Sequence, residues 1–158
     1  MKVETREWGT VEVPDEAIVH LPEGLLGFED LHRFVFIDVE EFRPFMWFLS
    51  VDDPEVGFAV ADPYYFHAGP YDVNLTEADE NTLDLEEGDT IAIFVIVTIA
   101  DGGRQITANL KGPMVFNTRN RLAKQVVVYG SSFSVRQPML SRRVVPIHAA
   151  IAQGPGRP

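Results

Sequence analysis

Two adjacent aspartates, Asp52 and Asp53, lie in the stretch SVDDPEVGFAVADP and are the residues that most resemble a chemical site. Neighbouring carboxylates can act as a general acid and base, can hold a metal ion, or can form the acidic tip of a turn between two strands. Asp53 precedes Pro54, which favours extended backbone, and aspartate readily closes a turn with its side chain. Adjacent side chains on an extended chain point to opposite sides, which is poor geometry for sharing a proton or a metal. The pattern therefore favours a strand-ending turn, while a small-ligand-binding β-barrel or an acid-dependent hydrolase using Asp52, Asp53 and one histidine remains the alternative.

Other signatures of catalysis or metal binding are missing from the sequence. The histidines, His20, His32, His67 and His148, are far apart and form none of the close spacings typical of zinc ligands. Cysteine is absent, which excludes disulfides, thiolate nucleophiles and cysteine-bound zinc. No GxSxG or phosphate-loop motif occurs. Apart from the Asp52–Asp53 alternative, we therefore predict no catalytic residue, metal or cofactor.

Apolar and aromatic residues are dense on both sides of the two aspartates. They comprise residues 45–48, Phe58 and residues 64–66. Because a strand alternates its side chains between two faces, half of them fill a core and the other half need a second cover. A protein partner is one such cover, since aromatic side chains dominate protein interfaces, and the protein's own loops are the other.

The charges are sorted along the chain. Residues 1–43 carry 11 acids and 4 bases, residues 44–103 carry 13 acids and no lysine or arginine, and residues 104–158 carry 9 bases and no acid. If these segments stay apart in space, the acidic part attracts a basic protein and repels nucleic acid. If they interleave, much of the asymmetry cancels.

The elements that position these residues are predicted to be strands. Short alternating or β-branched runs recur between Gly, Pro, Asp and Asn, which is typical of an all-β domain. We expect a single-domain, barrel-like antiparallel sheet with one or two short helices: one over residues 75–85 with Thr76 as N-cap, and a further turn over residues 120–125. Gly9 and the Asp101–Gly103 stretch are expected to form tight turns.

The two ends of the chain differ from this pattern. The charged, alternating N-terminus contains no apolar signal segment, and the apolar run at residues 90–100 is about half the ~20 residues of a membrane helix, so we expect a cytoplasmic protein with no membrane contact. We expect the domain to span residues 1–140 and a basic, Pro- and Gly-rich tail to follow at 141–158. The apolar stretch 144–151 in this tail could dock on the barrel or on a partner.

Four sequence blocks, taken in order, resemble the bacterial flagellar assembly factor FliW family. They are LPEGLLGFEDLHRFVF (21–36), FLSVDDPEVGFAVADP (48–63), NLKGPMVFNTRNRLAKQVV (109–127) and SVRQPML (134–140). Two positions depart from the family pattern, with Leu49 in place of a glutamine and Gly112 in place of an alanine. The glycines of GLLGFED, Gly24 and Gly27, are explained most simply as turn residues.

The resemblance implies a cytoplasmic, non-enzymatic, barrel-like protein that binds two proteins in turn. One is CsrA, a basic RNA-binding translational repressor of flagellin mRNA, and the other is newly made flagellin, which displaces CsrA as it accumulates. From residue type, we expect residues 45–66 to supply the partner surface. Its apolar anchors would be Trp47, Phe58 and Tyr65, and its acidic contacts to CsrA would be Asp52, Asp53 and Glu55.

Overall fold

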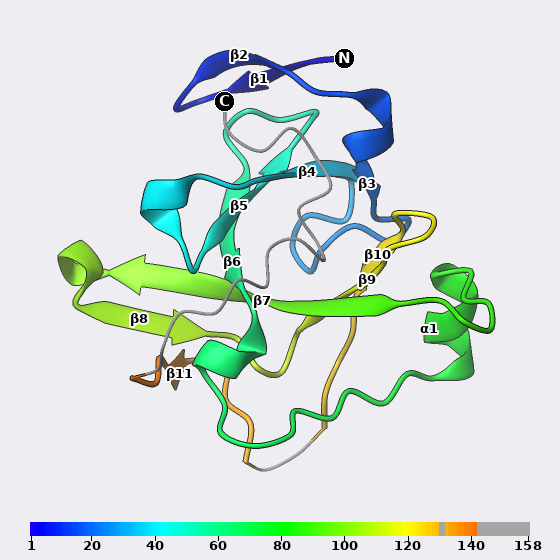
Figure 1. Ribbon diagram of the computed structural model, residues 1–158, viewed down its shortest axis with the longest axis vertical. Helices are drawn as coiled ribbons and strands as arrows, with labels where there is room; N and C mark the ends of the chain where they lie inside the picture. The colour runs from blue at the N-terminus through cyan, green and yellow to red at the C-terminus, as the bar shows by residue number, and fades with distance from the viewer. Residues whose placement is uncertain (130–131, 142–158) are drawn as a thin grey trace.

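The computed structural model describes residues 1–129 and 132–141 of the 158-residue chain. Strands dominate, joined by short 3-10 helices and one α-helix (Figure 1). The strands are β1 (Lys2–Thr5), β2 (Gly9–Glu12), β3 (Val19–His20), β4 (Arg33–Ile37), β5 (Met46–Ser50), β6 (Gly57–Ala61), β7 (Ile91–Ala100), β8 (Gln105–Ala108), β9 (Met114–Asn117), β10 (Ala123–Gln125) and β11 (Gln137–Pro138). The helices are η1 (Asp15–Ala17), η2 (Glu40–Phe42), η3 (Pro63–Tyr65), α1 (Glu77–Thr82) and η4 (Asp101–Gly103).

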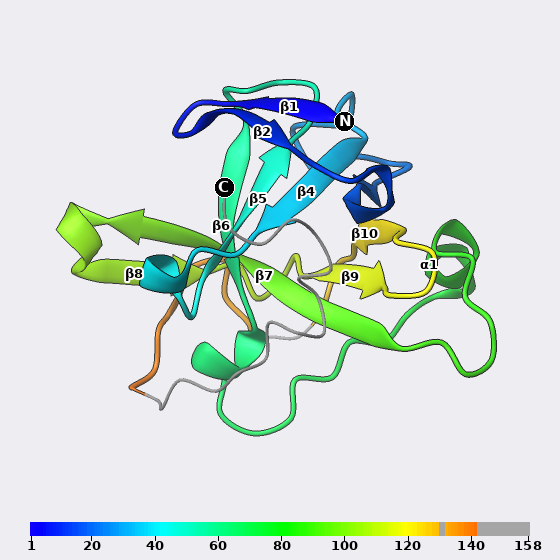
Figure 2. The same ribbon diagram turned by 45° about the horizontal axis from the view of Figure 1, so that its top comes forward.

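The main sheet is antiparallel and curls into a half-barrel (Figures 1 and 2). Its strand order is β10-β9-β7-β6-β5-β4-β3, and β8 with β11 extends from β7. The long strand β7 changes partners along its length. Residues 91–94 pair with β9, whereas residues 95–100 pair with β6 and β8. The two ends of the order approach each other where the N–H of His20 donates to the carbonyl of Arg121 at 2.9 Å. The predicted all-β, barrel-like fold is confirmed.

Both faces of the sheet are covered by the protein itself. One face packs phenylalanines from four strands, and Phe36 lies within 5.7 Å, between ring centroids, of Phe48, Phe94 and Phe116. Such offset and edge-to-face rings each add to the burial of apolar area. The opposite face of β4 and β5 is covered by the β1–β2 hairpin and the segment that follows it, whose buried members are Val3, Val11, Val13, Ala17 and Ile18.

The helix α1 forms where the sequence predicts it. Thr76 caps its N-terminus with a capping box: the Thr76 hydroxyl accepts from the N–H of Asp79 at 3.1 Å, and the Asp79 carboxylate accepts from the N–H of Thr76 at 2.9 Å. The next residue after the helix, Leu83, is fully buried against Val115 and Val126 and anchors it to the sheet. No helix in residues 1–129 and 132–141 is long and apolar enough to cross a membrane.

The second predicted helical turn is wrong, because residues 123–125 form strand β10. Two asparagines close a turn before it: the side-chain carbonyl of Asn117 accepts from the N–H of Arg119, and that of Asn120 accepts from the N–H of Leu122. Arg121 adopts a φ of +62°, which lies outside the right-handed α-helical region. Local side-chain bonds to the backbone thus replaced the helical ones. The expected turns at Gly9 and at Asp101–Gly103 are present, and positive φ angles occur at Gly9, Gly102 and Gly103.

Candidate partner-binding surface

The two aspartates singled out from the sequence form the turn between β5 and β6. The Ser50 hydroxyl accepts from the backbone N–H groups of Asp52 and Asp53, at 3.2 and 3.0 Å. The Asp53 carboxylate accepts from the N–H of Glu55 at 3.0 Å, and its carbonyl accepts from the N–H of Val56 at 3.1 Å. The turn interpretation is therefore confirmed, because both residues close the backbone locally.

The ionisation of Asp52 also differs from that of a catalytic acid. Arg33 on β4 donates two hydrogen bonds to the Asp52 carboxylate, and this contact lowers the pKa of Asp52. A general acid that works near neutral pH needs a raised pKa. Glu55 in turn lies 3.5 Å from a guanidinium nitrogen of Arg6 in the first hairpin. The turn is an acidic, ion-paired surface feature, and this geometry gives the hydrolase alternative no support.

The described histidines are occupied by backbone contacts or lie at the surface. His32 Nδ1 lies 2.9 Å from the carbonyl of Leu21, and His67 Nε2 lies 3.1 Å from that of Pro70. Within residues 1–129 and 132–141, no three His, Asp or Glu side chains gather as a metal site would require. His148 lies outside the described residues.

The expected aromatic anchors do not lie on one surface. Trp47 pairs with Ala59 across β5 and β6, whereas Phe58 pairs with Phe48, so Trp47 and Phe58 point to opposite faces of the sheet. The Trp47 ring stacks on Phe42 with centroids 4.5 Å apart, while Phe58 packs on the other face. Both rings are half-buried.

Tyr65 lies in a third environment. Its side chain has 0% exposure and packs in the cluster that contains Phe45, Phe66 and Val95. The short helix η3 holds it there, because the Asp62 carboxylate caps the helix by accepting from the N–H of Tyr64 at 2.7 Å. The expectation that Tyr65 is an exposed anchor is therefore corrected: tertiary burial makes it a core residue.

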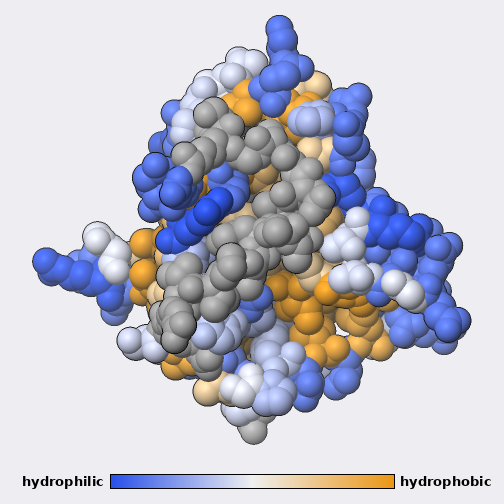
Figure 3. Space-filling model, viewed as in Figure 1, coloured by the Kyte–Doolittle hydropathy of each residue, from blue (hydrophilic) through white to orange (hydrophobic). Residues whose placement is uncertain are grey.

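A stronger acidic surface lies elsewhere, on α1 and the loop that follows it. We call residues 76–89 the acidic helix–loop; it carries seven carboxylates, Glu77, Asp79, Glu80, Asp84, Glu86, Glu87 and Asp89, and no base. It lies at the right of Figure 1, where the space-filling view in Figure 3 is strongly hydrophilic. These acids belong to the acid-rich segment 44–103, whose charge predicted attraction to a basic protein, but the sequence did not single out this helix and loop as the surface.

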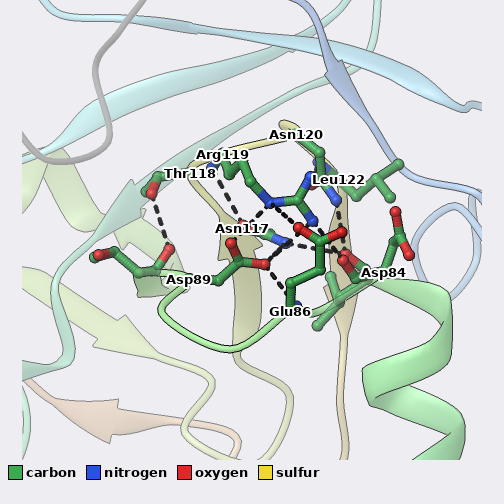
Figure 4. A network of polar contacts seen from close by, with 10 residues as sticks. Asp84, Glu86, Asp89, Asn117, Thr118, Arg119, Asn120 and Leu122 are labelled. Carbon is green, nitrogen blue, oxygen red and sulfur yellow. Dashed lines mark hydrogen bonds and ion pairs between the residues drawn. The ribbon is translucent and has the colours of Figure 1, made fainter.

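Two bases from the C-terminal third of the chain fold against this region. Arg119 bonds Asp89, with its Nε 2.7 Å from a carboxylate oxygen, and lies 3.4 Å from Glu86 (Figure 4). The contact with Arg119 lowers the pKa of Asp89 to about 2. The buried Asn117 amide donates to the same carboxylate and to the carbonyl of Leu83, which fixes the loop on the sheet. The charge asymmetry is thus partly cancelled here.

Lys124 is the second base, and it joins three parts of the fold. Its ammonium lies 2.7 Å from Asp79 on α1 and 3.3 Å from Glu23, which precedes the GLLGFED turn. Burial disfavours the charged form of Asp79, but hydrogen bonds from Lys124 and Thr76 outweigh burial and lower the pKa of Asp79. Thr82 also donates to Glu23, at 2.9 Å. The acidic helix–loop is thereby held against residues 23–29.

Both departures from the family pattern have local structural roles. Leu49 is 8% exposed and packs against Gly57. A Cβ added to Gly57 would lie only 2.6 Å from Leu49 Cδ2. At Gly112, a Cβ would lie 2.8 Å from Gln125 Nε2 and 3.0 Å from Asn109 Nδ2. Glycine at position 112 thus leaves room for these two amides. One of them, Gln125, donates to the Gly112 carbonyl at 3.1 Å.

Comparison with known proteins gives one consistent result. The family model described as FliW protein matches residues 2–139. A flagellar assembly factor FliW from Geobacter sulfurreducens is 35% identical over 157 residues, covering 99% of this chain and 94% of the relative. Another from Bdellovibrio bacteriovorus is 38% identical over 148 residues, covering 92% of this chain and 84% of the relative. A crystal structure of the flagellar assembly factor FliW matches with a TM-score of 0.80 at 29% identity, covering 91% of this chain and 100% of that one.

Proposed function

The chain belongs to the FliW family of flagellar assembly factors, and from this premise we propose that it binds CsrA and flagellin in turn in the cytoplasm. Bound CsrA releases flagellin mRNA for translation. Accumulating flagellin then occupies the protein, frees CsrA and stops further synthesis. The protein acts by binding rather than by catalysis.

The acidic helix–loop is the observation that carries this proposal. Its seven carboxylates face only Arg119 and Lys124 as ion-pair partners among the described residues. Glu77, Glu80 and Glu87 are exposed. The remaining negative field steers a basic protein toward this side of the molecule and repels the phosphates of mRNA.

The β5–β6 turn is a second, weaker acidic contact in the proposal. Of the three acids at this turn, Asp52 pairs with Arg33 and Glu55 pairs with Arg6, and the third is Asp53. Little net charge therefore remains at the turn. Trp47 and Phe58 are each only half-buried, which leaves part of each side chain accessible to a partner. Because they lie on opposite faces, we assign at most one of them to any single partner.

Calorimetric titration with purified CsrA tests the proposal. We expect binding that weakens as salt is raised, because exposed charges are screened within ~8 Å at physiological ionic strength. Prior addition of the same organism's flagellin should abolish the CsrA signal. Binding of neither partner by the folded protein would refute the proposal.

Charge variants then locate the surface. The triple variant Glu77→Gln, Glu80→Gln and Glu87→Gln should weaken CsrA binding by about 0.6–3 kcal/mol, at ~0.2–1 kcal/mol for each exposed charge. The matched control, Glu7→Gln, Glu16→Gln and Glu41→Gln, makes the same charge change at other exposed sites and should leave the affinity nearly unchanged. Equal losses in both triples would mean that net charge, and not this surface, governs binding.

A further inference from the structure

An apolar groove lies between the GLLGFED turn and the chain that continues β10. We call it the edge groove; residues 23–29 form one wall, residues 125–127 another, and Val135 closes one side around a volume of about 390 Å³. Leu26, Val127 and Val135 are 86%, 62% and 56% exposed. In Figure 3, hydrophobic side chains gather to the lower right of the centre, where β7 and the chain that follows β10 overlap in the view of Figure 1. A cluster of exposed aliphatic side chains around a hollow marks a docking site.

The backbone along this groove is an open sheet edge. The N–H of Val126 donates to the carbonyl of Pro113, and that of Val128 donates to the carbonyl of Lys111, each at 2.9 Å. In an antiparallel ladder, alternate residues point their backbone groups to the other side, so those of Val127 face away from residues 111–113. Within the described residues, no hydrogen bond reaches the Val127 backbone. Such an edge accepts an added strand.

We propose that the C-terminal segment Val144–Ile151 of the same chain docks in the edge groove as an added strand. This inference is independent of the proposed function. Val135 lines the groove, and the described chain ends at Ser141, only six residues later. Six residues span at most about 21 Å, so six more can bring the chain back to Val135 by residue 147, in the middle of the apolar segment.

The chemistry of the segment matches that of the groove. The sequence VVPIHAAI is apolar and rich in β-branched residues, which suit a strand on an aliphatic surface. Its single proline is compatible with an outermost strand, where one row of N–H groups has no partner. Arg142 and Arg143 precede it. The groove presents Glu29, which has no ion-pair partner among the described residues, together with the base Lys111 and with Glu23, which pairs with Lys124. Opposite charges therefore meet as the aliphatic side chains are covered.

The absence of cysteine permits a direct test in the full chain. The pair Val127→Cys with Ile147→Cys is treated with a short bismaleimide linker, and the linked monomer is quantified. The control pair is Ile99→Cys with Ile147→Cys: Ile99 is 39% exposed and pairs with Ile106, whose carbonyl accepts from the N–H of Met139. Position 99 is thus also within reach of the tail, but lies outside the groove.

We expect about tenfold more linked monomer for the 127–147 pair than for the 99–147 pair, which corresponds to ~1.4 kcal/mol of docking. Adding Leu26→Asp, at an exposed wall position, should reduce the first yield toward the second without changing the second. Equal yields from both pairs would overturn the proposal. Linked dimers that increase with protein concentration would also overturn it, since they would assign the groove to a second copy of the chain.

Discussion

Replacing Gly24 by alanine should separate the architectural role of the GLLGFED turn from the mere need for a flexible loop. Gly24 and Gly27 have φ angles of +66° and +88°, so alanine costs about 1–2 kcal/mol at either position. Their surroundings differ. A Cβ on Gly24 would lie 2.6 Å from the Phe28 carbonyl oxygen and 2.7 Å from Glu29 Cα, whereas a Cβ on Gly27 meets nothing within 4 Å.

Because the atoms that clash with Gly24 are backbone, they cannot rotate away, and overpacking adds about 1–3 kcal/mol. We therefore expect Gly24→Ala to lower the unfolding free energy by about 2–5 kcal/mol and Gly27→Ala by about 1–2 kcal/mol. Urea unfolding at neutral pH, followed by circular dichroism, measures both, with equal m-values as the check on comparability. Equal costs at the two positions, or a larger cost at Gly27, would show that the close approach at Gly24 does not govern this turn.

Two further predictions concern the bases that hold the acidic helix–loop. Lys124→Met should lower the unfolding free energy by about 1–3 kcal/mol, because Lys124 and Asp79 are only 13% and 12% exposed and the carboxylate loses its cation. Adding Asp79→Asn should recover part of this loss in a double-mutant cycle by urea unfolding, and strict additivity would contradict the pairing. For Arg119, the Asp89 pKa of about 2 means that the Asp89 contribution is complete above the unfolded pKa of about 3.9 and is lost as the pH falls toward 2. Arg119→Met, which returns the Asp89 pKa toward its ordinary value, should therefore lose less stability on acidification through this range than the wild type, measured by thermal unfolding. The control Lys111→Met, at an exposed position, should lose as much stability on acidification as the wild type does. A pH profile of stability for Arg119→Met that runs parallel to that of the wild type would contradict the assignment.

Features governed by local rules could be predicted from the sequence. Period-two runs predicted the strands, Thr76 predicted the start of α1, and the Asp52–Asp53 turn followed from proline and aspartate chemistry. The prediction of a helical turn at residues 120–125 was wrong, because asparagine side chains bond the nearby backbone and the chain continues into β10. The four blocks also predicted the family, because their order carries information that no single block has.

Tertiary structure decided which of the candidate residues share a surface. The pairing register of β5 and β6 placed Trp47 and Phe58 on opposite faces, and a one-residue slip between the two strands would have placed them on the same face. Closure of the half-barrel brought Lys124 to Asp79 and brought the Leu26 N–H to within 3.0 Å of Gln125 Oε1, across 99 positions of sequence. Such contacts depend on how the whole sheet curls. The sequence alone therefore determined the strands, turns and family, while the packed sheet decided which bases meet the acids of α1 and its loop, and that an apolar groove opens beside β10.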